Sequence, residues 1–354
     1  MLDLIKKFDS ADMLTMLQNF PQQCRDAFML GKGIELPSSY HQFNNIVFSG
    51  MGGSAIGGDI IRTYCLYKLN LPIFVFRNYN LPSFINEDTL FFACSYSGNT
   101  EETIASFQEA RRKKAKIVVI SSGGELITLA QRKNIPFIKI PSGYPPRQSL
   151  GYFVFVPLYL LQKIKILNNL EPELEETFYL LERMRDKKLS PEIKKENIAF
   201  DTALLMLNRF PVIYSQIDYL DVVSMRWRAQ LAENSKVLSS INFLPELNHN
   251  EIVGWRFPKS VLKNFIIFLL RDNTEQARIR LRIEITKELL KKDGFLIKEV
   301  RAEGRSLMAR ILSLIYIGDF VSYYLAILNQ IDPTPVKPIA YLKKRLAKIS
   351  HKGK

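Results

Sequence analysis

The chain of 354 residues is 47% hydrophobic, which is enough to bury the cores of two or three domains and argues against disorder. Its formal net charge of +14 fits either nucleic-acid binding or a basic enzyme that attracts anionic substrates; because the Lys and Arg clusters are scattered without a DNA-binding motif, we favour the enzyme and expect no nucleic-acid partner. Three scattered Cys and only three His argue against a disulfide framework and a metal site, and the absence of a signal-peptide pattern or a membrane-length apolar run predicts a cytoplasmic protein without membrane contact.

The N-terminal segment 1–40 has the apolar periodicity of one or two helices, which we expect to pack on the domain that follows. From residue 41 to 165, strand-like and helix-like stretches alternate, which predicts a parallel sheet covered by helices on both faces. Strands are expected at Asn45–Phe48, Ile73–Arg77, Leu90–Cys94, Ile117–Ile120 and Phe137–Ile140, with helices at Ala55–Leu69, Thr103–Lys113 and Leu126–Arg132. The apolar stretch Leu150–Leu167 predicts a helix that leaves this domain and is kinked or broken at Pro157.

Two loops of this first domain are suited to binding an anion. Ser49–Gly58 follows the first strand and contains five glycines, which let the backbone turn tightly and approach a ligand closely. Cys94–Thr103 follows a later strand, is rich in hydroxyl side chains, and leads into a helix whose first N–H groups lack partners. A phosphate satisfies such amides and hydroxyls together, so the sequence predicts one anionic ligand held between neighbouring strand ends. Neither loop has the spacing of a dinucleotide-binding or Walker A motif.

The second half repeats the alternation after a charged helical connector at 166–205. A second α/β domain is expected at 206–332, with strands at Pro211–Ser215, Val237–Ile241, Phe265–Leu270 and Phe295–Val300 and helices at Tyr219–Ala232, Thr274–Lys292 and Ser306–Gln330. It lacks counterparts of the two anion-suited loops. We therefore expect one phosphate site, in the first domain, with the second domain contributing catalytic groups across a cleft and residues 333–354 forming a C-terminal tail or helix.

The motifs together resemble a known family. Gly50–Ser54 and Ser95–Thr100 resemble a sugar isomerase (SIS) domain, which binds phosphosugars. Glu233–Lys236 and Pro245–Trp255, together with Pro145–Arg147, are more specific and resemble the bifunctional phosphoglucose/phosphomannose isomerase family over most of the chain.

This resemblance implies an α/β fold of two SIS-type subdomains, each a parallel-sheet αβα sandwich, with additional N- and C-terminal helices. It implies an aldose–ketose isomerase that interconverts glucose 6-phosphate and mannose 6-phosphate with fructose 6-phosphate through a cis-enediol, without a metal or cofactor. The alternatives are a phosphosugar-sensing regulator without catalysis and an amidotransferase-type synthase. The first would carry a DNA-binding domain, and the second needs a glutaminase domain that this sequence lacks.

The resemblance also assigns residues to the reaction. The substrate phosphate would be bound by Gly53, Ser54, Ser95, Ser97 and Thr100. Arg147 would stabilise the enediolate, because a guanidinium is always charged and can hold two oxygens. Glu233, at the end of a predicted helix, would be the base that removes the proton from C2.

His249 would move the proton that opens the sugar ring, since an imidazole transfers protons readily near neutral pH. In related isomerases this His reaches the active site of the other subunit, which implies a homodimer here. Glu246 and Glu251 flank His249 and are second-rank candidates that orient it.

A C-terminal Lys completes the family's set. Lys343 is our choice, with Lys344 and Lys337 as alternatives. Thr334 would shape the pocket near C2, where a small side chain would let both C2 epimers react.

Overall fold

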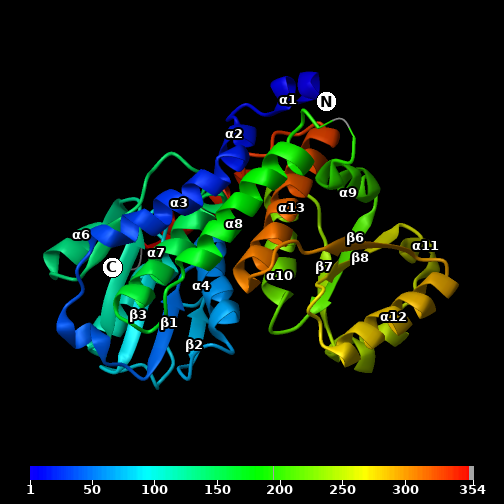
Figure 1. Ribbon diagram of the computed structural model, residues 1–354. Coiled ribbons are helices and arrows are strands. Elements are labelled where there is room, and N and C mark those ends of the chain that lie inside the picture. Colours follow the sequence, from blue (N-terminus) through cyan, green and yellow to red (C-terminus); the bar gives the residue numbers. More distant parts are fainter. Residues whose placement is uncertain (194, 351–354) are drawn as a thin grey trace.

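The computed structural model of the protein describes residues 1–193 and 195–350. Its first lobe contains a five-stranded parallel sheet in the order β2-β1-β3-β4-β5 (Figure 1). The strands are β1 (Asn45–Ser49), β2 (Ile73–Phe76), β3 (Thr89–Cys94), β4 (Lys116–Ser121) and β5 (Phe137–Lys139). β1 and β3 are neighbours, and Ser49 is paired with Ala93, so the loops that follow these two strands begin side by side.

Helices cover both faces of this sheet because its strands are apolar on both faces. Phe48 and Phe92 point to the face covered by α4 (Gly52–Cys65) and α7 (Leu150–Lys163). Val47 and Phe91 point to the opposite face, which is covered by α5 (Glu101–Arg112) and α6 (Gly124–Arg132).

The second lobe repeats this topology with four parallel strands in the order β7-β6-β8-β9. The strands are β6 (Phe210–Gln216), β7 (Ser240–Leu244), β8 (Phe265–Arg271) and β9 (Leu296–Arg301). One face of the sheet packs against α12 (Ala277–Lys292), and the other against α10 (Asp221–Gln230) and α13 (Leu307–Leu328). The predicted fold class, two parallel-sheet α/β lobes with additional terminal helices, is confirmed.

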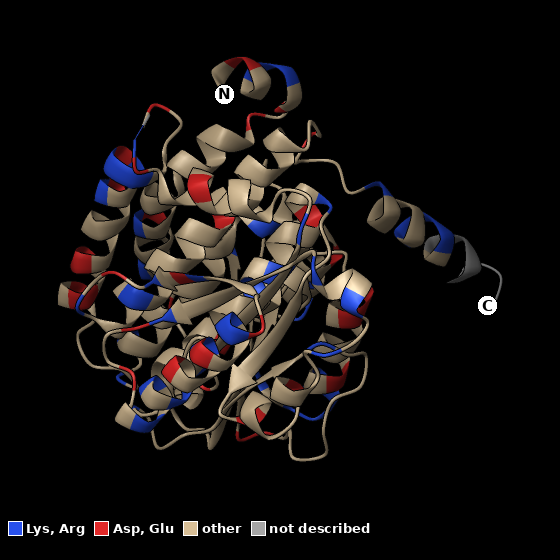
Figure 2. Cartoon of the chain, turned by 90° about the vertical axis from the view of Figure 1, so that its right-hand side faces the viewer, with Lys and Arg blue, Asp and Glu red and all other residues tan. Residues whose placement is uncertain are grey.

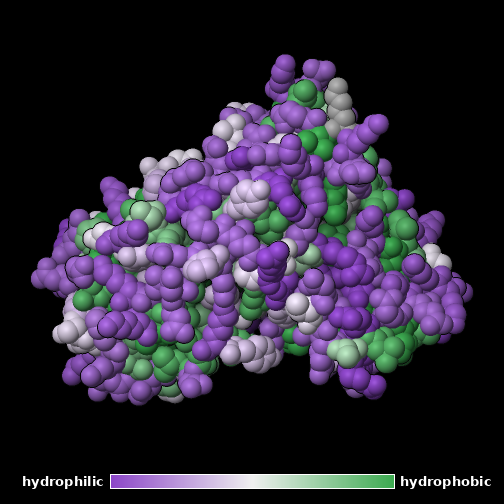
Figure 3. Space-filling view, in the orientation of Figure 1, coloured by the Kyte–Doolittle hydropathy of each residue, from purple (hydrophilic) through white to green (hydrophobic). Residues whose placement is uncertain are grey.

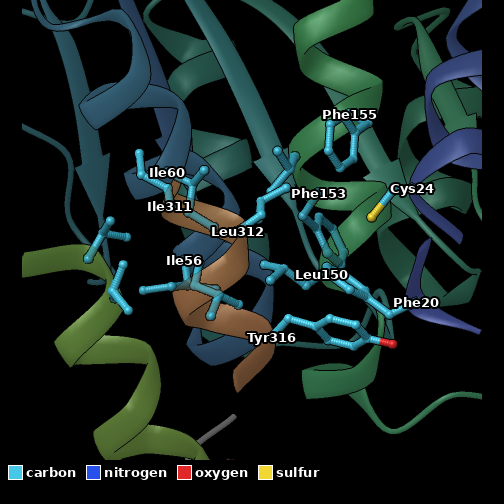
Figure 4. Close-up of a cluster of buried hydrophobic side chains, with 14 of the residues drawn as sticks. Phe20, Cys24, Ile56, Ile60, Leu150, Phe153, Phe155, Ile311, Leu312 and Tyr316 are labelled. Carbon is cyan, nitrogen blue, oxygen red and sulfur yellow. The ribbon is translucent and has the colours of Figure 1, made fainter. Parts of the chain in front are cut away.

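A single apolar cluster joins the two lobes. Figure 4 shows Ile56 and Ile60 of α4, Phe153 of α7 and Leu312 of α13 packed in it, together with side chains of the N-terminal helix α3 (Phe20–Leu30). Helix α13 is long and apolar enough to cross a membrane by length and composition, but 94% of its most apolar window is buried. It therefore serves this molecule as a core helix that fixes one lobe against the other.

Shorter elements complete the molecule. They are α1 (Leu2–Phe8), α2 (Met13–Gln18), α8 (Glu171–Met184), α9 (Ile198–Met206), α11 (Lys259–Leu262), α14 (Lys337–Ser350), 3₁₀ turns at Gly31–Gly33, Ser38–His41, Pro146–Gln148, Glu246–His249 and Glu251–Val253, and π turns at Arg185–Leu189 and Leu231–Ser235.

Four elements differ from the sequence-based expectation by more than two residues. Helix α4 begins at Gly52 rather than Ala55 and ends at Cys65 rather than Leu69, and α12 begins at Ala277 rather than Thr274.

Helix α7 continues through Pro157 and ends at Lys163. Pro157 leaves the Phe153 carbonyl without its helical N–H, and Gly57 of α4 lies against this carbonyl, where an added Cβ would stand 2.5 Å from the oxygen. β7 starts three residues later than expected, because the Val237 N–H bonds to the Leu231 carbonyl and so belongs to the end of the preceding helical segment.

Candidate active site

The two anion-suited loops contact each other at the ends of β1 and β3. The Tyr96 N–H donates to Ser54 Oγ at 3.1 Å, which ties the second loop to the start of α4. Ser95 Oγ lies 2.9 Å from Thr100 Oγ1 and accepts from the Gly98 N–H at 3.1 Å. The hydroxyls of Ser54 and Ser95 are therefore engaged within the protein, and both residues are buried.

The open part of these loops is made of backbone amides and two side chains. Neither α4 nor α5 has a side-chain cap, so their first N–H groups are available to a ligand. Ser97 is exposed and Thr100 is half-buried. Two helix N-termini beside two accessible hydroxyls form an arrangement that can bind a phosphate.

We expected the five glycines of the first loop to let the backbone approach a ligand closely. In the structure they mainly permit close packing within the protein. A Cβ on Gly50 would stand 2.7 Å from the Cys94 carbonyl, and one on Gly58 would meet the ring of Phe48. A Cβ on Gly53 would stand 2.7 Å from the Pro146 carbonyl and 3.0 Å from the Cα of Arg147. Gly53 thus brings the turn that carries Arg147 directly against the phosphate loop.

Arg147 is 2% exposed and lies between the lobes. Its Nε donates to Asn234 Oδ1 at 2.6 Å, and its Nη2 donates to the carbonyls of Pro333 and Thr334, each at 2.9 Å. Burial lowers the pKa of Arg147, while the charge of Glu233 acts in the opposite direction. The guanidinium nevertheless stays charged at neutral pH, so the site holds a fixed cation beside the phosphate loop.

Glu233 lies next to this cation. It stands on the π turn Leu231–Ser235 that ends α10, and its Oε2 is 3.5 Å from Arg147 Nη1. Its side chain is 27% exposed, so the carboxylate can reach a ligand placed at the mouth of the site. At this distance the carboxylate can remove a proton from carbon, and the guanidinium can stabilise the negative charge that develops.

A buried polar network behind Arg147 was not predicted from the sequence. Arg226 of α10 donates to both carboxylate oxygens of Asp319 on α13 and, at 2.7 Å, to the backbone carbonyl of Arg147. Asn234, which accepts from Arg147, donates to Ser322 Oγ at 2.9 Å. The network therefore fixes the backbone and side chain of Arg147 from the second lobe. The sequence feature that could have indicated this network is Asp319, an acidic residue within the apolar helix α13.

The side chain of Thr334 lies close to this cluster. Its carbonyl accepts from Arg147, and its Oγ1 is buried without a hydrogen-bond partner among the described residues. Buried hydroxyls are normally paired, so an unpaired one next to a charged site is a candidate ligand contact.

The structure places His249 away from these residues. β6 leads into α10, which returns alongside the sheet, so Glu233 lies at the edge where the strands begin. β7 then crosses the sheet over five residues, a span of roughly 15 Å, and His249 follows its far end. His249 is exposed, whereas Glu251 accepts from Tyr214 Oη at 2.5 Å and from Asn242 Nδ2, which holds the His249 segment on the sheet.

The candidate lysines also lie outside the Arg147–Glu233 cluster. Lys337, Lys343 and Lys344 are exposed on α14, which stands apart from the body of the protein in Figure 2. Within one chain, therefore, Arg147, Glu233 and the phosphate loops come together, whereas His249 and Lys343 do not join them.

Two parallel-sheet lobes of this topology, with paired anion loops on one of them, define a SIS-domain protein. A model of the SIS domain matches residues 39–136, and a model described as the bacterial phospho-glucose isomerase C-terminal SIS domain matches residues 195–346. A hypothetical protein from Thermus thermophilus shares the fold with a TM-score of 0.73 at 16% identity, over 99% of this chain and 93% of that one. The C-terminal domain of glucosamine-fructose-6-phosphate aminotransferase from Francisella tularensis does so with a TM-score of 0.70 at 14% identity, over 91% of this chain and 98% of that one.

Sequence relatives identify the family within this class. The chain belongs to the bifunctional phosphoglucose/phosphomannose isomerase family, which confirms the resemblance. A protein of that name from Caldicellulosiruptor bescii is 41% identical over 339 residues, covering 95% of this chain and 99% of the relative. Another from Thermoplasma acidophilum is 39% identical over 305 residues, covering 86% of this chain and 90% of the relative.

Proposed function

We propose that this protein interconverts glucose 6-phosphate and mannose 6-phosphate with fructose 6-phosphate by proton transfer between C1 and C2. Membership of the family supports the reaction and the hexose phosphate substrates. The observation that carries the proposal is the contact between Arg147 and Glu233 beside two uncapped helix N-termini. No metal or cofactor is required by this set of residues, because a fixed guanidinium can hold the developing charge.

In this proposal the phosphate binds to the loops of the first lobe. The backbone amides near Gly53 and Gly98 that begin the two helices donate to it, together with the hydroxyls of Ser54, Ser95, Ser97 and Thr100. The oxygens of Ser54 and Ser95 also accept backbone N–H groups, so these two side chains shape the loops as well.

The reacting carbons then lie between Glu233 and Arg147. The carboxylate of Glu233 takes the proton from C2 of the open-chain aldose, and the electrons of the C–H bond form the enediolate. The carboxylic acid, whose proton can exchange with solvent, then protonates C1, while the hydroxyl proton on O2 is transferred to O1, which leaves the C2 carbonyl of fructose 6-phosphate. Arg147 Nη1 faces Glu233, so it is the edge of the guanidinium that holds the enediolate oxygens.

We also propose that the active unit is a homodimer. Ring opening by His249 requires a second chain in this scheme, because His249 and Glu233 lie at opposite edges of one sheet. Val253 and Phe257, which follow His249, are 75% and 76% exposed, and exposed apolar residues of this kind mark contact surfaces. Leu281, Ile285 and Leu289 add an exposed apolar stripe along α12, at the lower right of Figure 3 where hydrophobic surface gathers.

Two further roles complete the proposal. The unpaired Thr334 hydroxyl next to Arg147 supports a place for Thr334 near C2 of the sugar, where its small size admits both epimers. Lys343 remains our choice for the C-terminal cation, supplied when α14 docks in the assembled enzyme. The cytoplasmic location is likewise part of the proposal.

A coupled assay of the purified protein with both hexose phosphates, run with a chelator present, tests this function. We expect fructose 6-phosphate from both aldoses, unchanged by the chelator, with exchange of the C2 proton for solvent deuterium. A regulator that only senses phosphosugars would bind glucose 6-phosphate without exchange or turnover, and that result would overturn the proposal.

A further inference from the structure

Lys236 has an uncommon backbone conformation at the end of the turn that carries Glu233. Its φ is +57°, in the left-handed region that non-glycine residues seldom adopt. Such conformations persist only where surrounding interactions hold them, and they cluster at functional sites. The interactions that hold Lys236 are therefore informative.

The ammonium group of Lys236 lies among four backbone carbonyl oxygens. Two belong to the turn itself, with Nζ 2.7 Å from Glu233 O and 3.2 Å from Asn234 O. Two belong to the segment after α13, with Nζ 3.3 Å from Asp332 O and 3.0 Å from Pro333 O. An ammonium has three N–H groups, so this shell uses its full donor capacity without any side-chain acceptor.

One of these four carbonyls, that of Pro333, also links Lys236 to Arg147. Pro333 O accepts from both Lys236 Nζ and Arg147 Nη2, so two cations share one oxygen. Burial and the nearby charge of Arg147 lower the pKa of Lys236, while Asp332 and Glu233 act against this decrease. Glu233, Arg147 and Asp332 are thus the charged groups that face the ammonium.

We infer that Lys236 is a positioning residue for the reaction: its ammonium fastens the turn of Glu233 to the Asp332–Thr334 segment and so fixes the carboxylate relative to Arg147. This inference rests on the proposed function, since it assigns Glu233 as the base. The ammonium acts in two ways on this shell of carbonyl oxygens, through its N–H donors and through its positive charge.

Three variants of Lys236 separate these effects. Lys236→Met removes the charge and the donors, Lys236→Gln keeps donors without charge, and Lys236→Arg keeps both. Lys114→Met is the matched control, because Lys114 is also left-handed, at φ +60°, and exposed like Lys236, but its side chain has no hydrogen bond or ion pair within the part of the chain that the structure describes.

Steady-state kinetics with glucose 6-phosphate gives the readout. We expect Lys236→Met to lower kcat by on the order of 10- to 100-fold while KM changes by less than about 3-fold, because the base is displaced but the phosphate loops are intact. Lys236→Arg should restore most of the lost kcat, and Lys236→Gln should lie between Lys236→Met and Lys236→Arg, because uncharged donors hold the carbonyl oxygens less strongly.

The following results would contradict the inference about Lys236. If Lys236→Met matches Lys114→Met in kcat, or if it lowers thermal stability while kcat and KM keep their wild-type values, the inference is wrong. If Lys236→Met does not fold, the same comparison is made with Lys236→Gln. A wild-type protein without isomerase activity would instead refute the proposed function, which keeps the two failures distinct.

Discussion

Two of the three nitrogens of the Arg147 guanidinium are hydrogen-bonded within the protein, so the nitrogen that remains for a substrate can be identified. Nε and Nη2 are occupied by Asn234 and by the carbonyls of Pro333 and Thr334, which leaves Nη1 facing Glu233 at 3.5 Å. A substrate oxyanion therefore has one place to bind on the guanidinium, between Nη1 and the carboxylate. This geometry orients the reacting carbons toward Glu233.

Arg147→Lys tests this assignment. A lysine keeps the charge but cannot span Asn234 and the two carbonyls while also presenting a donor to the enediolate, so kcat should fall by about 10²- to 10³-fold with a small change in KM. Steady-state kinetics beside the exposed control Arg183→Lys measures the effect. Unchanged turnover in Arg147→Lys would remove this residue from the mechanism.

Sequence motifs predicted which residues to examine at this site, but not how they are held. The Glu233 and Arg147 motifs identified two residues that prove to be in contact. The support from Arg226 and Asp319 was not predicted, because it joins positions 79 and 93 residues apart; the acidic Asp319 in an apolar helix indicated a buried polar contact but not its partner. The left-handed conformation of Lys236 could not be predicted either, because a lysine does not favour that conformation.

Among the elements, α13 connects the lobes, and the segment just before its start is held by α8, while its N-cap is Ser306. Glu176 of α8 accepts from the backbone N–H groups of Arg305 and Ser306, just before α13 begins. Partial burial alone would raise the pKa of Glu176, but these hydrogen bonds outweigh it and lower the pKa below the ordinary value of 4.5. The connector thus stabilises α13 as well as linking the two lobes in sequence.

Glu176→Gln should lower the free energy of unfolding by about 1 kcal/mol at neutral pH, the usual net contribution of one hydrogen bond. Because the pKa is lowered in the folded state, the contribution is present above pH 4.5 and is lost as the pH falls through the folded value. Urea unfolding of Glu176→Gln, wild type and the exposed control Glu171→Gln should therefore converge in acid. An equal difference at all pH values would contradict this account.

The order of strands and helices could be predicted from the apolar pattern. The bounds of β7 and the course of α7 differ from the prediction for separate reasons. The delayed start of β7 follows from the Val237 N–H, which bonds back to the Leu231 carbonyl, and Gly57 of α4 leaves room for the Phe153 carbonyl that Pro157 leaves unpaired in α7. The first is a local hydrogen bond and the second a contact between two helices, and apolar periodicity encodes neither.

In the whole molecule, a shared core fixes the phosphate loops, Arg147 and Glu233 relative to one another. His249 and Lys343 are exposed on segments that one chain does not bring to this cluster. The proposed homodimer resolves this separation if each site takes Glu233 from one chain and His249 of the partner subunit.

Subunit complementation between Glu233→Gln and His249→Asn tests this central claim most directly. Each variant alone should be nearly inactive, but unfolding and refolding them together produces mixed dimers with one intact site. With random pairing, half of the dimers are mixed, and the glucose 6-phosphate isomerase activity should recover to about a quarter of the wild-type value. Refolding each variant with itself is the control. If the mixture stays as inactive as either variant, the proposed site shared between subunits is contradicted.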